Sequence, residues 1–167
     1  MPEKTTLKRA RRDKREGKAP TTQAGEFVRE EMEHIRRGKH GARSTKQAIA
    51  IGLSKARRSG VKLPPPAGAT RKTKQSAASA TRAARHGHAH PSPKRSRAVS
   101  AALKREGRSA ASPKALARQA HNAARRRSHA ARSRSARQAA RTKGPQERKA
   151  AARRAARTRQ RRRRAHA

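Results

Sequence analysis

Large hydrophobic residues follow a helical period in only two segments, both in the first half of the chain. In the first segment, residues 22–37, Val28, Met32 and Ile35 follow Ala24 at spacings of four, four and three, with Phe27 beside them. This period places them on one stripe of an amphipathic helix. We expect Thr21 or Thr22 to cap its start and Gly38 to end it.

The second helical segment follows a glycine-bounded connection, residues 38–43. Ser44 and Gln47 have the spacing of a capping box, and the pattern continues to Arg58 before Gly60 ends it. The face toward the first segment carries Ile49, Leu53 and Ala56. The two segments therefore predict a helical hairpin, which Val61 and Leu63 cover before three prolines halt regular structure.

Composition limits how much more of the chain can fold. Only 31% of the 167 residues are hydrophobic, and most of these are Ala. Burying a large side chain yields about 1.5–3 kcal/mol, whereas ordering each residue costs about 1–2 kcal/mol. The predicted fold class is mainly α, a small two-helix hairpin plus largely disordered or conditionally helical basic tails. The predicted domains are a basic arm (1–20), the hairpin (21–63), a Pro/Gly/Ser-rich linker (64–98) and an Arg/Ala-rich tail (99–167).

The tail carries signals for helix boundaries. Ser112 followed by Pro113 is a start signal, and Gly144 followed by Pro145 is a stop. Like charges oppose an isolated helix, so we expect residues 112–143 and 146–164 to become helical when a polyanion neutralises them. A faint repeat at an offset of 68 residues, pairing Ser44 with Ser112, fits either a duplication or the Ala/Arg composition alone.

Charge is distributed unevenly between the two halves. Residues 1–70 hold 18 Lys and Arg against 7 Asp and Glu, whereas residues 71–167 hold 31 against 2. The net charges are therefore +11 and +29 of the total of +40. Self-repulsion of this size predicts a polyanionic partner, namely nucleic acid, either DNA or RNA.

The hairpin segment resembles a known family. Its residues 46–57 read K-Q-A-I-A-I-x-L-S-x-A-R after a Gly/Lys/Ser-rich turn, and the likeness covers residues 22–63. The segment is similar to a family of small basic bacterial proteins whose domain has no known function. The resemblance implies a bacterial source and brings no catalytic residues.

The second half resembles linker-histone tails and bacterial histone-like Ala/Lys/Arg proteins. Ser92-Pro93-Lys94-Arg95 is similar to the S-P-K-K motif of such tails, and Ser112-Pro113-Lys114-Ala115 is a poorer copy. That motif implies binding to A/T-rich minor grooves. The chain departs from those tails in holding 34 Arg against 15 Lys, which leaves a preference for duplex DNA open.

Clusters of basic residues in the second half are the predicted nucleic-acid-binding site. Guanidinium groups bind phosphate bidentately and stay charged at physiological pH. With one Phe and neither Tyr nor Trp, the chain lacks aromatic platforms for bases, so binding is expected to be blind to sequence. The predicted residues are Lys94, Arg95, Arg97, Lys114, Arg118, Arg125, Arg126, Arg127, Arg132, Arg134, Arg137, Arg141, Arg153, Arg154, Arg157, Arg159, Arg161, Arg162, Arg163 and Arg164.

Three groups of residues are candidates for a metal or catalytic site. The run His86, His88 and His90 is interpreted as an incidental polar stretch, and His34 and His40 as local polarity beside the interhelical turn. Glu30, Glu31 and Glu33 are interpreted as ion-pairing partners of neighbouring arginines. The sequence therefore predicts no enzyme activity, no metal and no cofactor.

A second hypothesis is a protein-interaction module whose hairpin docks on a partner or self-associates, the tails only localising it. A hairpin this small is expected to leave an apolar surface formed by Phe27, Met32, Ile35, Ile49 and Leu53. The longest apolar run, residues 48–51, is far shorter than a membrane span, and there is no Cys. We expect a soluble cytoplasmic protein of the nucleoid, without a leader or a membrane partner.

Overall fold

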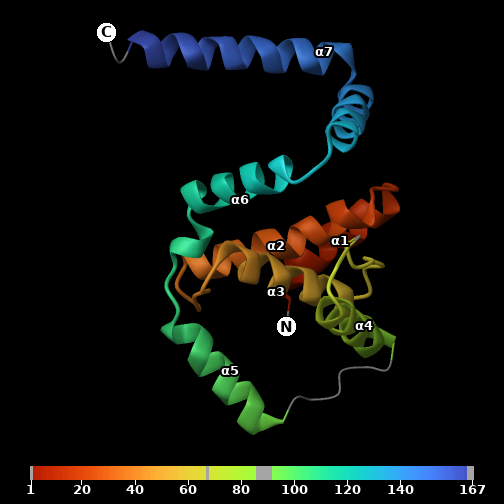
Figure 1. Ribbon diagram of the computed structural model, residues 1–167, viewed down its shortest axis with the longest axis vertical. Helices are drawn as coiled ribbons and strands as arrows, with labels where there is room; N and C mark the ends of the chain where they lie inside the picture. Colours follow the sequence, from red (N-terminus) through yellow and green to blue (C-terminus); the bar gives the residue numbers. More distant parts are fainter. Residues whose placement is uncertain (1, 67, 86–91, 165–167) are drawn as a thin grey trace. The chain divides into compact units, whose positions relative to one another are not determined.

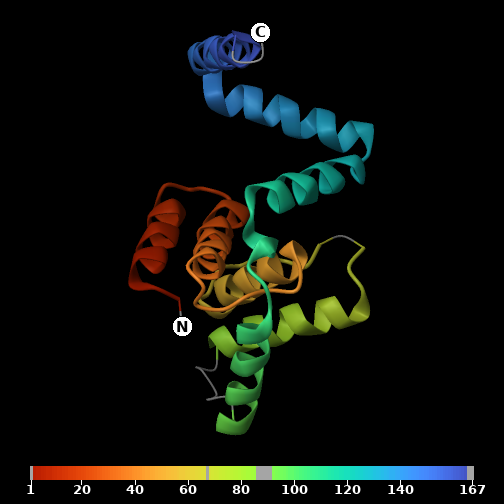
Figure 2. The ribbon, with the colours of Figure 1, turned by 90° about the vertical axis from the view of Figure 1, so that its left-hand side faces the viewer.

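The computed structural model describes residues 2–66, 68–85 and 92–164, and within these ranges its regular structure is helical (Figures 1 and 2). The mainly α prediction is confirmed. The chain divides into two compact units, Met1–Gln119 and Ala120–Ala167. The elements are α1 (Lys4–Arg15), α2 (Pro20–Arg36), α3 (Thr45–Arg58), α4 (Arg71–Arg85), α5 (Pro93–Arg105), the 3₁₀-helix η1 (Ser109–Ala111), α6 (Pro113–Arg125) and α7 (His129–Arg164).

Helices α2 and α3 form the predicted hairpin. Ser44 caps α3 as expected, because its Oγ accepts a hydrogen bond from the backbone N–H of Gln47 at 3.2 Å. The predicted threonine cap of α2 is wrong. This helix begins with Pro20 at its first position and has no side-chain cap. A proline at that position needs no hydrogen-bond partner, and its fixed φ suits the helix.

Gly38 ends α2 and reverses the direction of the chain. Its φ of +74° lies in the left-handed region, which glycine adopts without a steric penalty. The N–H of Gly38 donates to the carbonyl of Ile35 at 3.1 Å, and that of Lys39 donates to His34 at 3.0 Å. This pair of hydrogen bonds is a Schellman motif. It turns the connection back beside the last turns of α2.

The unit Met1–Gln119 is larger than a two-helix hairpin, so that part of the predicted fold class is wrong. The N-terminal segment, expected to be an arm, forms α1 and packs on α2, because Leu7 and Ala10 share the face that meets Phe27. Val61 and Leu63 close the same cluster, as predicted. Helix α4 packs on α3 inside the segment 64–98 that composition predicts to be a linker.

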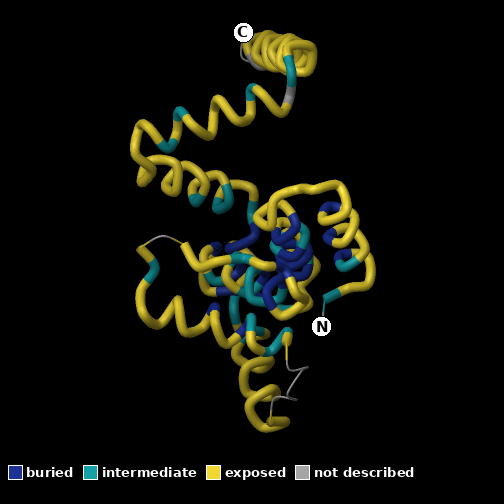
Figure 3. Tube along the Cα trace, turned by 90° about the vertical axis from the view of Figure 1, so that its right-hand side faces the viewer, coloured by how far each residue is buried: buried dark blue, intermediate teal, exposed yellow. Residues whose placement is uncertain are grey.

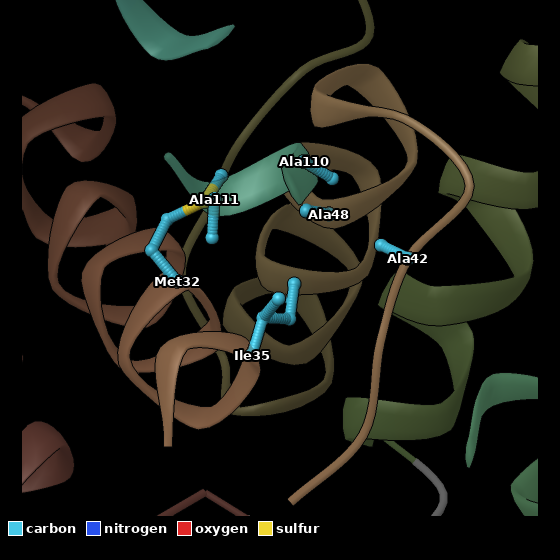
Figure 4. Close-up of a cluster of buried hydrophobic side chains, with 6 residues drawn as sticks. All are labelled: Met32, Ile35, Ala42, Ala48, Ala110 and Ala111. Carbon is cyan, nitrogen blue, oxygen red and sulfur yellow. The ribbon is translucent and has the colours of Figure 1, made fainter. Parts of the chain in front are cut away.

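The other end of the hairpin is covered by η1, far along the chain. Ala110 and Ala111 pack against a cluster that includes Met32 and Ile35 (Figure 4). Two side chains fix this cover: Thr45 Oγ1 donates to the carbonyl of Ala110 at 2.7 Å, and Arg36 Nε donates to that of Ala111 at 2.9 Å. The core is therefore completed by small residues from the predicted tail.

The expectation of largely disordered tails is also corrected, because the described residues of the tail are mostly helical. Ser92, Ser112 and Ser128 each accept a backbone hydrogen bond three residues on, which supplies the N-caps. Ala and Arg are strong helix formers. The predicted boundary at Gly144 is present, since its φ of 66° and ψ of 170° break α7 before Pro145.

Two glycines provide a matched test of the helix contact. A Cβ at Gly52 of α3 would lie 2.7 Å from Cα and 3.0 Å from N of Val28 in α2, whereas one at Gly25 would meet nothing within 4 Å. We expect Gly52→Ala to destabilise the unit by about 1–3 kcal/mol. Gly25→Ala should stabilise it by up to about 1 kcal/mol. Urea unfolding followed through the Ile35 methyl resonances measures both, and equal effects would contradict the close approach.

Candidate nucleic-acid interface

The predicted basic residues lie on three helices and on the connection before the last one. Those described are exposed (Figure 3); the side chain of Arg162 lies outside the described residues. Helix α5 carries Lys94, Arg95 and Arg97, and α6 carries Lys114, Arg118 and Arg125. Arg126 and Arg127 follow α6, and the remaining twelve predicted residues belong to α7.

Five cations in the second half of α7 share one side of the helix. Arg153, Arg157, Arg161 and Arg164 follow one another at spacings of four, four and three, and therefore share a stripe with Lys149. At a rise of 1.5 Å per residue, this stripe is about 22 Å long. In the middle of the helix the opposite side carries alanines. We call the five residues the α7 stripe.

The first half of α7 has a shorter counterpart. Arg134, Arg137 and Arg141 share one side of the helix, and Arg132 lies on the other. The break at Gly144 separates this group from the α7 stripe. The predicted residues are thus displayed as rows along helices. Among those that the structure describes, Arg153, Arg154 and Arg157 also line an open hollow on the surface of α7.

The acidic residues lie mainly in the first half of the sequence, whereas these rows lie in the second half. Among the described residues, every ion pair joins side chains between positions 3 and 55. In the unit Ala120–Ala167, 18 Lys and Arg stand against the single Glu147, a net charge of +17. Exposed helices with so little internal compensation produce a strong positive potential, which attracts polyanions.

Sequence reasoning missed the basic residues of α4. Exposed cations on this helix include Arg71, Lys72, Lys74 and Arg85. Composition places them in a linker because Ser, Thr and Ala dominate the segment. A signal was present, since Ala77 and Ala80 are spaced by three and are both buried.

The carboxylates of α2 are not arranged as predicted. Glu33 pairs with Arg37 at 2.9 Å, in agreement with the expected ion pairing. Glu30 and Glu31, however, are buried and face Lys55 of α3, whose Nζ lies 3.7 Å and 2.6 Å from their oxygens. Their predicted pairing with neighbouring arginines is therefore wrong, because their ion-pair partners among the described residues are Lys55, His34 and His40.

The two histidines beside the interhelical connection also contact carboxylates in this region. His34 Nε2 lies 2.9 Å from Glu3 Oε1, and His40 Nε2 lies 3.1 Å from Glu31 Oε1. Hydrogen bonds from His34 and Lys39 lower the pKa of Glu3 to about 2, so this carboxylate is ionised at neutral pH. The histidine run at positions 86, 88 and 90 lies outside the described residues.

The apolar surface expected on the hairpin is largely covered. Phe27, Met32 and Ile35 are 1%, 5% and 0% exposed, and Ile49 and Leu53 are half-buried. Helix α1 and η1 cover the residues that a two-helix hairpin would leave exposed. These side chains form the core, so the partner surface that the sequence predicted is not available as such.

The fold and the basic rows define a small helical protein with cation-rich helices, and comparison with known proteins adds one finding. Residues 15–67, about a third of the chain, match a family of unknown function, DUF6496. The matched segment contains α2 and α3, where the sequence resembles a family without known function. Neither the curated proteins nor the solved structures compared with the chain gave a match.

The length and composition of the helices also bear on membrane insertion. Among the helices of the described residues, none is both long enough and apolar enough to cross a bilayer.

Proposed function

We propose that the chain is a non-enzymatic protein that binds nucleic acid without sequence preference, through contacts between its basic helices and the phosphate backbone. The observation that carries the proposal is the exposure of the described cations of α5, α6 and α7, while the ion pairs of the described residues end at residue 55. Cations without internal partners are available to phosphates. In contrast, the carboxylates between positions 3 and 33 pair with lysines, arginines and histidines of the same segment of the chain, residues 3–55.

The geometry of α7 suits a backbone more than a pocket ligand. The α7 stripe repeats about every 6 Å along the helix axis, so successive guanidinium groups can contact successive phosphates. Phe27, the one aromatic residue other than histidine, is buried. The protein therefore offers bases no stacking platform of Phe, Tyr or Trp, and its affinity should depend on charge density.

Phosphates would also stabilise the helix that binds them. Arg153, Arg157 and Arg161 are like-charged neighbours at spacings of four, and each such pair opposes the helix by about 0.2–0.5 kcal/mol. A bound phosphate between neighbours removes this repulsion. We infer that α7 melts at a higher temperature on nucleic acid than alone. The same relief is expected on duplexes of random sequence.

The proposal predicts a steep dependence of binding on salt. If the basic helices neutralise about ten phosphates, log K should fall with log salt concentration at a slope of about −9 on duplex DNA. Fluorescence anisotropy of labelled random-sequence duplexes, from about 0.05 to 0.3 M salt, measures the slope.

Parallel arms with a structured RNA and with A/T-rich duplexes identify the favoured polyanion. A slope shallower than about −3 on every polyanion would reject the electrostatic mechanism. Strong dependence on base sequence at constant salt would reject backbone recognition.

A further inference from the structure

The cluster around the end of α2 has a second feature that the basic helices do not explain. One oxygen of Glu31 and one ring nitrogen each of His34 and His40 lie within 4.8 Å of one another. Glu31 is fully buried, and neither of its carboxylate oxygens accepts a hydrogen bond from the described residues. Lys55 is close to one oxygen without hydrogen-bonding geometry. A buried carboxylate requires a nearby cation. Lys55 supplies one at Oε2, whereas Oε1 faces His40 and accepts no hydrogen bond from the described residues.

Hydrogen bonds fix the proton positions on His40. Its Nδ1 lies 3.0 Å from the carbonyl oxygen of Gly41, which can only accept, so Nδ1 carries the proton. In the neutral ring the lone pair is then on Nε2, 3.1 Å from Glu31 Oε1. Two acceptors at this distance repel each other unless a proton or a metal ion lies between them.

His34 is oriented in the same way by a carboxylate. Its Nε2 lies 2.9 Å from Oε1 of Glu3, and a carboxylate oxygen accepts a hydrogen bond, so Nε2 donates and Nδ1 is the nitrogen left for a metal ion. Histidines that bind metal ions regularly donate their other N–H to a carboxylate or a backbone carbonyl. His34 shows the arrangement with a carboxylate, and His40 shows the one with a backbone carbonyl.

We propose that Glu31, His34 and His40 bind a divalent transition-metal ion, with Zn²⁺ as the best match to two imidazoles and one carboxylate. Bonds of about 2.0–2.2 Å in a tetrahedral site place donor atoms about 3.4 Å apart. The separation of 3.1 Å between His40 and Glu31 is already close to this value. The third donor must move inward by at most about 1.4 Å, and the fourth position is left for water.

The ion would clip the connection after α2 to the helix itself. Glu31 and His34 belong to α2, whereas His40 follows the reversal at Gly38. A small helical unit without disulfides gains stability from such a clip. Lys55 is the competing cation, since its Nζ lies 2.6 Å from Glu31 Oε2.

The test uses the full chain with His86, His88 and His90 changed to Ala, so that the linker histidines add no metal binding. Calorimetric titration with Zn²⁺ at about pH 7.5 should give one equivalent per chain and a raised melting temperature. His34→Ala and His40→Ala should each weaken binding at least tenfold. Glu3→Gln keeps an oxygen that can accept from His34 but loses the charge that pairs with His34 and Lys39, and it should weaken binding about tenfold. The exposed His121→Ala and His129→Ala serve as controls and should change nothing.

Two further measurements do not depend on disruptive variants. Lys55→Gln removes the competing cation and should tighten Zn²⁺ binding. Imidazole nitrogen resonances of His34 and His40 in the unmutated cluster should shift together on adding one equivalent of Zn²⁺, those of His34 at Nδ1 and those of His40 at Nε2. Unshifted resonances, or binding that survives His40→Ala unchanged, would overturn the proposal.

Discussion

Replacing Arg153, Arg157, Arg161 and Arg164 with Gln should weaken binding to a random-sequence duplex by on the order of 10²–10³-fold at physiological salt. The four side chains belong to the α7 stripe, and each is expected to release about one counterion on contact with a phosphate. Gln has nearly the same helix propensity as Arg, so the helix is retained while the charge is lost. Anisotropy measurements should also show the salt slope reduced by about 3–4 units.

A charge-matched variant makes the prediction specific. Changing Lys4, Lys8, Arg11 and Arg15 of α1 to Gln lowers the net charge by the same amount, from +40 to +36. These four residues are exposed and take part in none of the ion pairs of the described residues. The α1 variant should lose less than about threefold in affinity. Equal losses would mean that total charge drives binding and that α7 has no special part.

The hairpin could be predicted because its signals are local. Three large apolar residues at helical spacing, the Ser44 cap and the Gly38 stop each act within a few residues of the chain. Such signals determine where a helix lies and which face is buried. They do not identify what covers that face when the cover is made of alanine.

The parts that sequence reasoning missed are held by small residues and by long-range hydrogen bonds. Ala110 and Ala111 in η1 contribute two methyl groups and two carbonyls, and nothing in an Ala-rich tail distinguishes them from their neighbours. Gly41 is a similar case, since its N–H donates to the carbonyl of Leu103 at 2.8 Å and a Cβ there would collide with the backbone of Glu106. A contact between residues 41 and 103 leaves no periodic pattern in the sequence from which it could be predicted.

The two candidate sites also differ in whether local sequence signals can predict them. Exposed basic rows on α7 follow from composition and from helical spacing alone, so their residues could be named in advance. The cluster of Glu31, His34 and His40 depends on how sharply the chain reverses at Gly38. Spacing alone favoured neighbouring arginines as the partners of Glu31, because it gives no indication that α3 approaches this side of α2 with Lys55.

Phe27→Ala should destabilise the unit Met1–Gln119 by about 3–5 kcal/mol, which is much of the stability of a small domain. Phe27 is 1% exposed, and three of the buried residues around it, Ala10, Ala24 and Ala56, are already small. Alanines fixed on α1, α2 and α3 have no side-chain freedom with which to fill the cavity. Urea unfolding followed by the methyl resonances of Ile35 measures the loss without interference from the helical signal of α7.

The same variant separates folding from binding. Because the α7 stripe belongs to the other compact unit, Phe27→Ala should change affinity for a random-sequence duplex by less than about threefold. Val99→Ala, at a position 51% exposed, is the control and should change stability by less than about 0.5 kcal/mol. Should Phe27→Ala prevent folding, Phe27→Leu gives a graded loss of about 1 kcal/mol in its place. Wild-type stability in Phe27→Ala would refute the assigned core. A large loss of affinity in a partly unfolded variant would refute the proposal that α7 binds nucleic acid without help from that core.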